Sequence, residues 1–345
     1  ATVGGRAGGG TWPVAPRTVA VGATVLAGLL AMVRLGHKSL WLDEGYSLGH
    51  ASMAWADFWR VLVEREPNGA LHALVLFAWY RVSEAEWWVR LPSAAFAVAT
   101  VPLLYLLLKR LFDDRAGAIG AVLLALNGFS LRFAQEARTY SLLMLLTTAS
   151  VLAFVAYAQD HRRRQWWLWV LVTAALPYTH VFGWLAIAVQ AVAAVARRGP
   201  SRPPRRALIG GFGVIGLVGL PIALALLAGN DEGQATGIPG VTIVRFVGVY
   251  ARVAGDLGIA LLAAVGLLWA WTVVVAIHEV RTRGAVQLDE RQWGVAVLVA
   301  WLLVPTVLIA LGSPIQPLFG PRSFALLVPA ASGLTAVGLL TLRRP

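Results

Sequence analysis

The sequence contains no cysteine, and this absence excludes several kinds of chemistry at once. The chain can form no disulfide, no catalytic thiolate and no metal site with cysteine ligands. Any metal ion that it binds must therefore use His, Asp or Glu side chains.

Charged residues are also scarce. Only 13% of the 345 residues are charged and 58% are hydrophobic, a balance that soluble domains of this length do not usually show. The net charge of +12 would suggest nucleic acid in a soluble protein. Here the arginines lie in short clusters between apolar runs and form no continuous patch. The composition therefore indicates a membrane protein and argues against a nucleic-acid partner.

Apolar runs dominate what the sequence does contain. The first follows Arg6 and Arg17 without a small-residue cleavage site, so we interpret it as an uncleaved helix behind a disordered cytoplasmic N-terminus, residues 1–17. Ten runs are candidates for membrane spans: 18–36, 88–108, 116–131, 140–158, 166–178, 181–196, 207–228, 258–278, 293–311 and 323–342.

The basic clusters provide a test of this assignment, because Lys and Arg are retained on the cytoplasmic side of a membrane. All clusters share that side if residues 166–196 form two short helices that break near Pro177 and His180, and if the dozen residues Leu71–Val82 stay outside as an interfacial helix. A single long tilted helix over 166–196 is the alternative. The clusters are Arg6 and Arg17; Lys109, Arg110 and Arg115; Arg162, Arg163 and Arg164; Arg197, Arg198, Arg202, Arg205 and Arg206; Arg281, Arg283 and Arg291; and Arg343 and Arg344.

The predicted fold class is thus an all-α polytopic protein of the bacterial cytoplasmic (inner) membrane with about ten transmembrane helices. Residues 18–342 form a single transmembrane domain, and we expect no soluble C-terminal domain. The first outer loop, 37–87, is long enough for juxtamembrane helices. In it Trp55, Phe58, Trp59, Leu62 and Val63 recur at helical spacing, which predicts an amphipathic helix on the membrane surface. A second outer loop runs from about 230 to 256.

Acidic, His and Arg side chains gather at the predicted outer ends of the helices, where they could line one cavity. Asp43 and Glu44 follow the first span; a carboxylate there could act as general base on a hydroxyl, or the two could be a solvated pair at a helix end. Glu136 follows Arg132 by four residues, which also fits a local salt bridge. His180 could be a ligand or a turn residue.

The motifs at these positions resemble those of the GT-C membrane glycosyltransferases, in the branch with bacterial protein O-mannosyltransferase-like and aminoarabinose-transferase-like enzymes (glycosyltransferase family 39-like). They occur in the family's order over residues 39–330: Ser39-Leu-Trp-Leu-Asp-Glu-Gly-Tyr-Ser47, Leu71-His72, Ser83-Glu84, Val89-Arg-Leu-Pro-Ser93, Gln135-Glu-Ala-Arg-Thr-Tyr140, Tyr178-Thr-His180, Pro321-Arg322 and Leu326-Leu-Val-Pro329.

This resemblance implies an extracytoplasmic enzyme that transfers a sugar from a polyprenyl-phosphate donor to an acceptor glycan, lipid or protein, with inversion. Asp43 matches the family's catalytic acidic residue and Glu136 its second-loop acidic residue. The chain departs from the family in Pro67-Asn-Gly-Ala-Leu-His72, where Pro-Pro-Leu often precedes the His, and in Arg322-Ser323, where Arg-Tyr is common.

In the mechanism that follows, arginines neutralise the donor phosphate and one carboxylate takes the acceptor's proton. We assign the phosphate to Arg138 and Arg322, with Arg90 behind them, and the proton to Asp43. Glu44 or Glu136 orients the acceptor or holds a divalent cation. His72, Gln135, Tyr140 and His180 are the remaining cavity residues, and a metal site of Asp43, Glu136 and His180 stays an open alternative.

Two other functions compete with this one. A lipid or lipid-linked-sugar flippase also needs many helices and a cavity, but transporters commonly carry mid-membrane ionisable residues and internal repeats, which are not evident here. A membrane scaffold would have no use for the outer acidic and arginine residues.

Overall fold

The computed structural model describes residues 14–197, 202–228, 241–282, 288–314 and 318–342. Residues 1–13 of the expected N-terminal segment and residues 229–240 of the expected second outer loop lie outside these ranges. All regular elements in the described part are helices: α1 (Pro16–Met32), α2 (Leu42–Ala51), α3 (Trp55–Glu64), α4 (Ala70–Tyr80), α5 (Glu86–Leu111), α6 (Asp114–Ala125), α7 (Gly128–Ala134), α8 (Tyr140–Asp160), α9 (Arg163–Thr179), α10 (Gly183–Ala196), α11 (Arg205–Ala228), α12 (Ile243–Val253), α13 (Ile259–Thr282), α14 (Glu290–Gly312), the 3₁₀ helix η1 (Pro321–Leu327) and α15 (Val328–Leu342). The expected all-α fold is confirmed.

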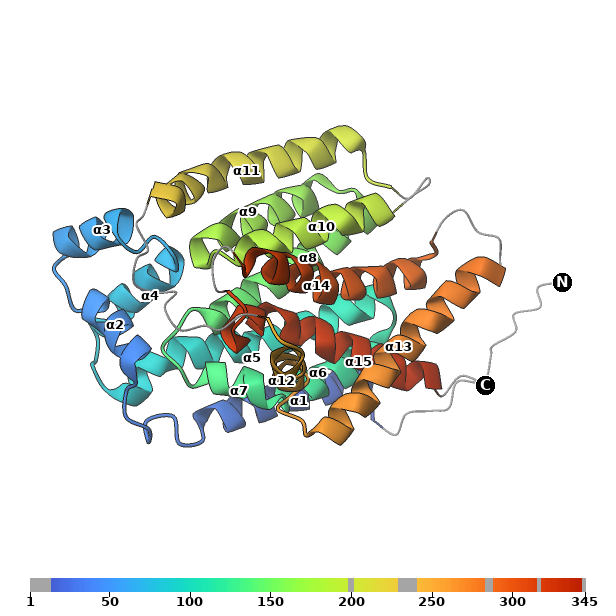
Figure 1. Ribbon diagram of the computed structural model, residues 1–345, viewed down its shortest axis with the longest axis horizontal. Coiled ribbons are helices and arrows are strands. Elements are labelled where there is room, and N and C mark those ends of the chain that lie inside the picture. Colours follow the sequence, from blue (N-terminus) through green and yellow to red (C-terminus); the bar gives the residue numbers. More distant parts are fainter. Residues whose placement is uncertain (1–13, 198–201, 229–240, 283–287, 315–317, 343–345) are drawn as a thin grey trace.

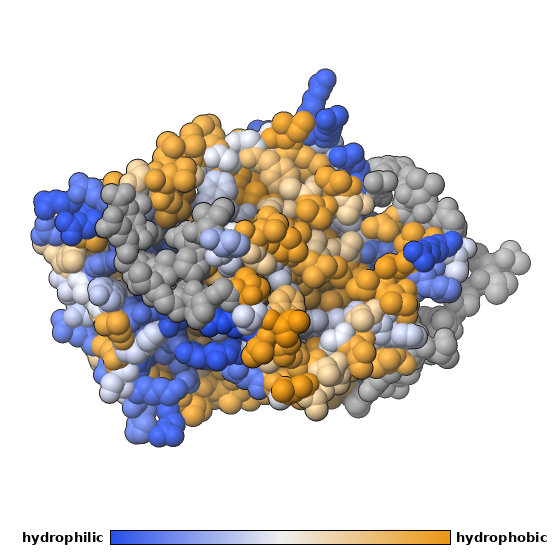
Figure 2. Space-filling view, viewed as in Figure 1, coloured by the Kyte–Doolittle hydropathy of each residue, from blue (hydrophilic) through white to orange (hydrophobic). Residues whose placement is uncertain are grey.

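The long helices lie side by side along the molecule, and α2, α3 and α4 form one end of it (Figure 1). The flanks of the bundle are largely hydrophobic, and hydrophilic residues gather at the end that carries α2 and α3 (Figure 2). This distribution suits a bundle whose sides face lipid, since backbone hydrogen bonds within helices leave only apolar side chains to meet the hydrocarbon.

The structure supports fewer full-length membrane spans, within the described residues, than the ten that the sequence suggests. Within the described residues, six helices are long and apolar enough to cross a membrane, or seven if the bent pair α6 and α7 is one span. The helices α1, α9 and α10 occur where predicted but have 17, 17 and 14 residues. At about 1.5 Å per residue, 14 residues cover about 21 Å of a core about 30 Å thick. The count of ten is therefore not confirmed.

Two breaks in the apolar runs have clear local causes, and only the first of them was predicted. Between α9 and α10 the chain turns after Pro177, and a side chain at Gly183 would place its Cβ 2.3 Å from the carbonyl oxygen of Leu176. The run 116–131 is broken instead of continuous, because α6 and α7 meet at an angle of 61°. Asn127 lies at this break, where its Oδ1 accepts from the Ser130 N–H at 2.9 Å and its Nδ2 donates to the Val253 carbonyl at 3.0 Å.

The amphipathic helix predicted in the first outer loop is α3. Its Phe58 and Leu62 side chains are buried against α4, and the centre of the Phe58 ring lies 4.4 Å from that of Phe77. Trp55 and Trp59 remain exposed. The helix is thus confirmed, and its placement on the membrane surface stays a prediction.

Basic residues from several loops meet at the end of the bundle opposite α2. Arg110 at the end of α5 is paired with Asp160 at the end of α8. Arg197, after α10, donates from Nη2 to Glu290 Oε1 of α14 at 2.6 Å. The ends of α5, α8 and α10 and the start of α14 therefore share one end of the bundle, as the charge pattern predicts. The cytoplasmic location of this end stays a prediction from that pattern.

Candidate functional site

The start of α2 carries the acidic pair that the sequence singles out. Successive residues of an α-helix point about 100° apart, so the two carboxylates face different surroundings. The Glu44 side chain is only 1% exposed, whereas that of Asp43 is 25% exposed. The pair is therefore not a uniform solvated cluster, and each member has its own arginine partner.

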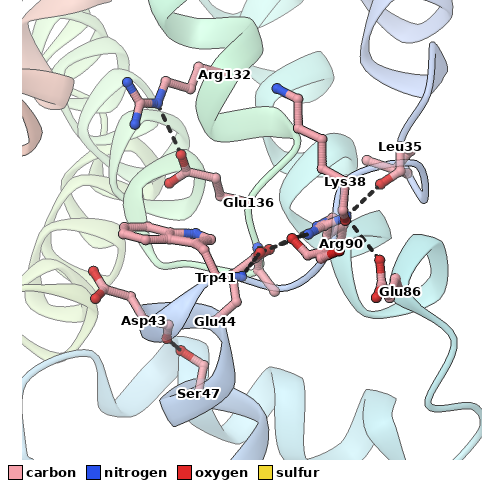
Figure 3. A network of polar contacts seen from close by, with 12 residues as sticks. Leu35, Lys38, Trp41, Asp43, Glu44, Ser47, Glu86, Arg90, Arg132 and Glu136 are labelled. Atoms are coloured by element: carbon pink, nitrogen blue, oxygen red, sulfur yellow. Dashed lines mark hydrogen bonds and ion pairs between the residues drawn. The ribbon is translucent and has the colours of Figure 1, made fainter.

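Glu44 forms a buried, bidentate ion pair with Arg90 of α5 (Figure 3). Arg90 donates from Nε to Glu44 Oε1 at 2.8 Å and from Nη2 to Oε2 at 2.7 Å. The Ala137 N–H, in the turn between α7 and α8, donates to the same Oε1 at 2.8 Å. Arg90 also donates at 2.8 to 3.3 Å to the carbonyl oxygens of Leu35, Lys38 and Ser39. These contacts fix the segment between α1 and α2 against both α5 and the α7–α8 turn.

Asp43 is paired with Arg322 of η1, a residue 279 positions further along the chain. The guanidinium carbon of Arg322 lies 4.3 Å from the centre of the Trp41 ring, a cation–π geometry. The Asp43 and Arg322 side chains are both partly open, at 25% and 39% exposure. The structure thus brings together the predicted base and a predicted phosphate-binding arginine.

A cavity of about 630 Å³ lies beside this pair, within the size range of small-molecule sites. Side chains from the α1–α2 segment, from α5 and from α7 with its following turn surround it. It is lined by Lys38, Ser39, Trp41, Glu44, Arg90, Gly128, Leu131, Arg132, Gln135 and Glu136. Four of these were predicted site residues: Glu44, Arg90, Gln135 and Glu136. Asp43 and Arg322 lie outside the lining and adjoin it through Trp41.

Glu136 is the least satisfied carboxylate of the cavity. Its Oε1 accepts from Arg132 Nε at 3.1 Å, which is the local salt bridge that the spacing of four residues suggests. Its Oε2 is buried and has no hydrogen-bond partner. Burial raises the pKa of Glu136, and the neighbouring Arg132 opposes that shift only in part. Glu136 is thus a carboxylate with one free acceptor inside the cavity.

Arg138 and Gln135 act mainly on the protein backbone. Arg138 Nη1 donates to the Asp43 carbonyl at 3.1 Å and to Ser47 Oγ at 2.9 Å, so it holds the start of α2. Gln135 Nε2 donates to the Val33 carbonyl at 2.8 Å, near the end of α1. Together with Arg90, these residues support the cavity wall, which differs from the phosphate-binding role that we assigned to Arg90 and Arg138.

His72, Tyr140 and His180, which the sequence analysis assigned to the cavity, are not among the residues that line it. His72 and His180 are buried, and the rings of Tyr140 and His180 lie 5.8 Å apart. His180 Nδ1 accepts from the Phe182 N–H at 3.2 Å, within the turn before α10. This contact fits the interpretation of His180 as a turn residue.

The described residues contain no group of three His, Asp or Glu side chains close enough to hold a metal ion. Asp43, Glu44 and Glu136 are instead paired with three different arginines. The donor set therefore does not fit the metal site of Asp43, Glu136 and His180 that the sequence left open, and we derive no step through a metal.

The two buried histidines predict a pH dependence of stability. Burial, with a smaller effect of Arg138, lowers the pKa of His72 and that of His180 from 6.5 to about 3. Below pH 6.5 these two histidines bind protons in the unfolded chain but stay neutral in the folded chain. The free energy of unfolding therefore falls as pH drops from 6.5 toward 3. Each histidine contributes about 1.4 kcal/mol per pH unit inside this window. We expect the unfolding midpoint in detergent to fall between pH 7 and 5, a range above most carboxyl titrations.

The control is the variant with His72→Asn and His180→Asn. Its midpoint should change little over the same pH range, since the groups that take up protons on unfolding are gone. The raised pKa of Glu136 acts with the opposite sign, because that carboxylate stabilises the fold when protonated. A midpoint that fell equally in the variant and the original chain would contradict the assignment.

Six of the ten lining residues were not predicted as site residues, and three of these six carry a cation or an indole N–H. Lys38 and Trp41 come from the α1–α2 segment, and Arg132 appeared only as the partner of Glu136. The signal for Lys38 was available, because it is one of only two lysines in the chain and lies at the outer end of a span. No pattern in the sequence indicates that the Trp41 side chain turns into the cavity.

Residues 71–219 match the family described as dolichyl-phosphate-mannose-protein mannosyltransferase. No curated protein matches the sequence significantly. Among solved structures, ArnT from Cupriavidus metallidurans bound to undecaprenyl phosphate is similar with a TM-score of 0.68 and 17% identity, over 96% of this chain and 61% of that chain. Its apo state gives a TM-score of 0.69 and 16% identity over the same shares.

The archaeal oligosaccharyltransferase AglB from Archaeoglobus fulgidus, in complex with an inhibitory peptide and a dolichol-phosphate, is similar with a TM-score of 0.61 and 12% identity, over 94% of this chain and 50% of that chain. The chain thus spans about 61% of the length of ArnT and half of AglB. These likenesses extend over nearly the whole chain, and they agree with the family match over residues 71–219. The chain therefore has the GT-C fold of membrane glycosyltransferases.

Proposed function

We propose that this protein transfers a sugar from a polyprenyl-phosphate carrier to an acceptor hydroxyl or amine, with inversion at the anomeric carbon. The observation that carries the proposal is the Asp43–Arg322 pair beside the cavity. It joins a carboxylate that solvent can reach to a cation suited to phosphate, next to a space large enough for a sugar phosphate.

Asp43 acts as the general base. One of its carboxylate oxygens takes the proton of the acceptor, whose oxygen or nitrogen forms a bond to the anomeric carbon on the face opposite the phosphate. The bond between that carbon and the phosphate oxygen breaks, and its electron pair leaves with the carrier phosphate. Because the second pKa of such a phosphate is near 6, the leaving group needs little help from an acid.

The cations around the cavity stabilise this leaving phosphate. Arg322 retains this role from the sequence analysis, because its partner Asp43 is only partly buried and can exchange it for phosphate. Lys38 lines the cavity and has no ion-pair partner among the described residues. Arg132 contacts Glu136 through Nε and can offer its other nitrogens to phosphate oxygens. Arg90 and Arg138 hold the walls in place.

The charge pattern supports an orientation in which α2 and the cavity face away from the cytoplasm, because the basic loops meet at the opposite end. The inner membrane of a bacterium remains the proposed location. The acceptor, whether glycan, lipid or protein, would reach Asp43 from the outer solution or the membrane surface.

The experiment that tests this function uses the whole chain in proteoliposomes. A polyprenyl phosphate carrying a radiolabelled sugar is supplied with a membrane extract as acceptor, and release of the free carrier phosphate is measured. We expect label to appear in acceptor, or in water as free sugar, at a rate above that of empty vesicles. Movement of the intact lipid-linked sugar across the bilayer without loss of the sugar would favour the flippase and contradict the transferase.

A further inference from the structure

Two residues of the cavity lining each have a buried polar atom without a hydrogen-bond partner among the described residues. One is the indole nitrogen of Trp41, a donor, and the other is Oε2 of Glu136, an acceptor. Figure 3 draws the Trp41 ring and the Glu136 carboxylate next to each other. Both residues line the same cavity. Unpartnered buried polar atoms are rare in folded proteins, because each lacks both water and a hydrogen bond.

A hydroxyl group is the chemical complement of such a pair. It offers one O–H donor and two acceptor lone pairs, so a single hydroxyl can accept from the indole N–H and donate to the carboxylate. A protonated amine or a metal ion would leave the indole N–H without an acceptor. A sugar ring presents several hydroxyls at fixed angles and thus can place one of them between the two atoms.

We propose that Trp41 and Glu136 are specificity-determining residues that recognise one hydroxyl of the donor sugar. This inference rests on the proposed function, and it names the group of the donor sugar that the cavity recognises. The raised pKa of Glu136 is consistent with a carboxylate held away from water until the ligand arrives.

Their surroundings keep the two side chains in place. Arg322 covers one face of the Trp41 ring, and Arg132 holds the other oxygen of Glu136. Recognition of a hydroxyl by fixed, buried groups discriminates strongly against the analogue that lacks it, because the site's polar atoms then stay unpaired. Sugars that differ in one hydroxyl position should therefore bind to this cavity with different affinities.

The test measures binding and needs no transfer. Purified protein in detergent is titrated with mannose 1-phosphate, glucose 1-phosphate and galactose 1-phosphate, with the monodeoxy analogues of each, and with inorganic phosphate. For the hexose that binds best, we expect one deoxy analogue to bind about tenfold or more weakly than its parent. The other analogues should bind within about threefold of the parent.

In Trp41→Phe and in Glu136→Gln, the ratio between the affinities for the parent sugar phosphate and for that deoxy analogue should fall toward one. The affinity for inorganic phosphate should not change. Trp41→Phe preserves the ring under Arg322, and Glu136→Gln preserves the shape of the side chain. The controls are Trp167→Phe, an exposed tryptophan of α9, and Glu64→Gln, an exposed glutamate of α3. Both controls should show the original discrimination.

The proposal is overturned if no deoxy analogue of any of the three hexose phosphates differs from its parent, or if the difference persists in both variants. Transfer by the original chain with discrimination unaffected by either variant would refute this inference and leave the proposed function standing. Discrimination in binding without any transfer or sugar release in the proteoliposome assay would support the inference and refute the function.

Discussion

Asp43→Asn is expected to lower the rate of sugar transfer by about 10²- to 10⁴-fold, the range that general-base help typically supplies. The amide has nearly the shape of the carboxylate but cannot take the acceptor's proton. Donor binding should persist, because Arg322, Lys38 and Arg132 keep their charges and the amide releases Arg322 from its ion pair. The measurement is single-turnover transfer of labelled sugar at saturating donor, with donor affinity measured separately.

Asp57→Asn is the matched control. Asp57 lies in the same outer loop, on α3, and its side chain is 59% exposed in a pair with Arg60 at 3.5 Å. The same chemical change there should leave transfer within about twofold of the original, since exposed pairs contribute only about 0 to 1 kcal/mol. Asp43→Asn should also unfold near the original temperature, because its pair with Arg322 is partly open to solvent. A variant that is both folded and fully active would remove Asp43 from the mechanism.

The sequence was most informative about helices and their direction. Long apolar runs have one stable solution in lipid, because only a helix satisfies its own backbone there. The basic clusters then decide which loops share an end, and the pairs Arg110–Asp160 and Arg197–Glu290 lie together as that pattern requires. The same logic placed Asp43 and Arg322 at one level, although 279 positions separate them.

The sequence could not assign the partners of the individual arginines. Arg90, Arg132, Arg138 and Arg322 all stand at predicted outer helix ends, and all four carry the same charge and donor set. Arg90 is buried among carbonyl oxygens, while Arg132 faces the cavity. That difference depends on how α5 and α7 are rotated relative to the α1–α2 segment, which hydrophobic periodicity constrains only loosely. The exact number of spans is not confirmed for a related reason, since short helices such as α10 differ in length from full spans by only a few residues.

Asp43 and Glu44 are neighbours in one motif but have different surroundings and different roles. The turn of about 100° between them directs one carboxylate to Arg322 and solvent, and the other into the protein. Glu44 Oε1 accepts from Arg90 Nε and the Ala137 N–H, and Oε2 accepts from Arg90 Nη2 and the Trp41 N–H, so each oxygen already has two donors and none is left for an incoming acceptor. We therefore reassign Glu44 from the expected catalytic role to that of a positioning residue, which fixes α2 and with it the place of Asp43.

Arg90→Met should be the most destabilising of these changes, by about 3–5 kcal/mol, because it leaves Glu44 as a buried carboxylate without a counterion. Three backbone carbonyls lose their donor in the same step. The free energy of unfolding, measured by SDS titration of the detergent-solubilised protein, provides the readout. Limited proteolysis should show faster cleavage between α1 and α2, since the guanidinium ties that segment to α5.

The double variant with Glu44→Gln and Arg90→Met separates charge from packing. Removing the unpaired carboxylate should recover part of the lost stability. The loss that remains is the contribution of the carbonyl oxygens of the α1–α2 segment that no longer have a hydrogen-bond donor. Arg60→Met, in the exposed pair with Asp57, should cost no more than about 1 kcal/mol. If Arg90→Met were as mild as Arg60→Met, the buried pair would not be what holds α2, and the position of Asp43 would have to be maintained by Arg138 and its bonds to the Asp43 carbonyl and Ser47.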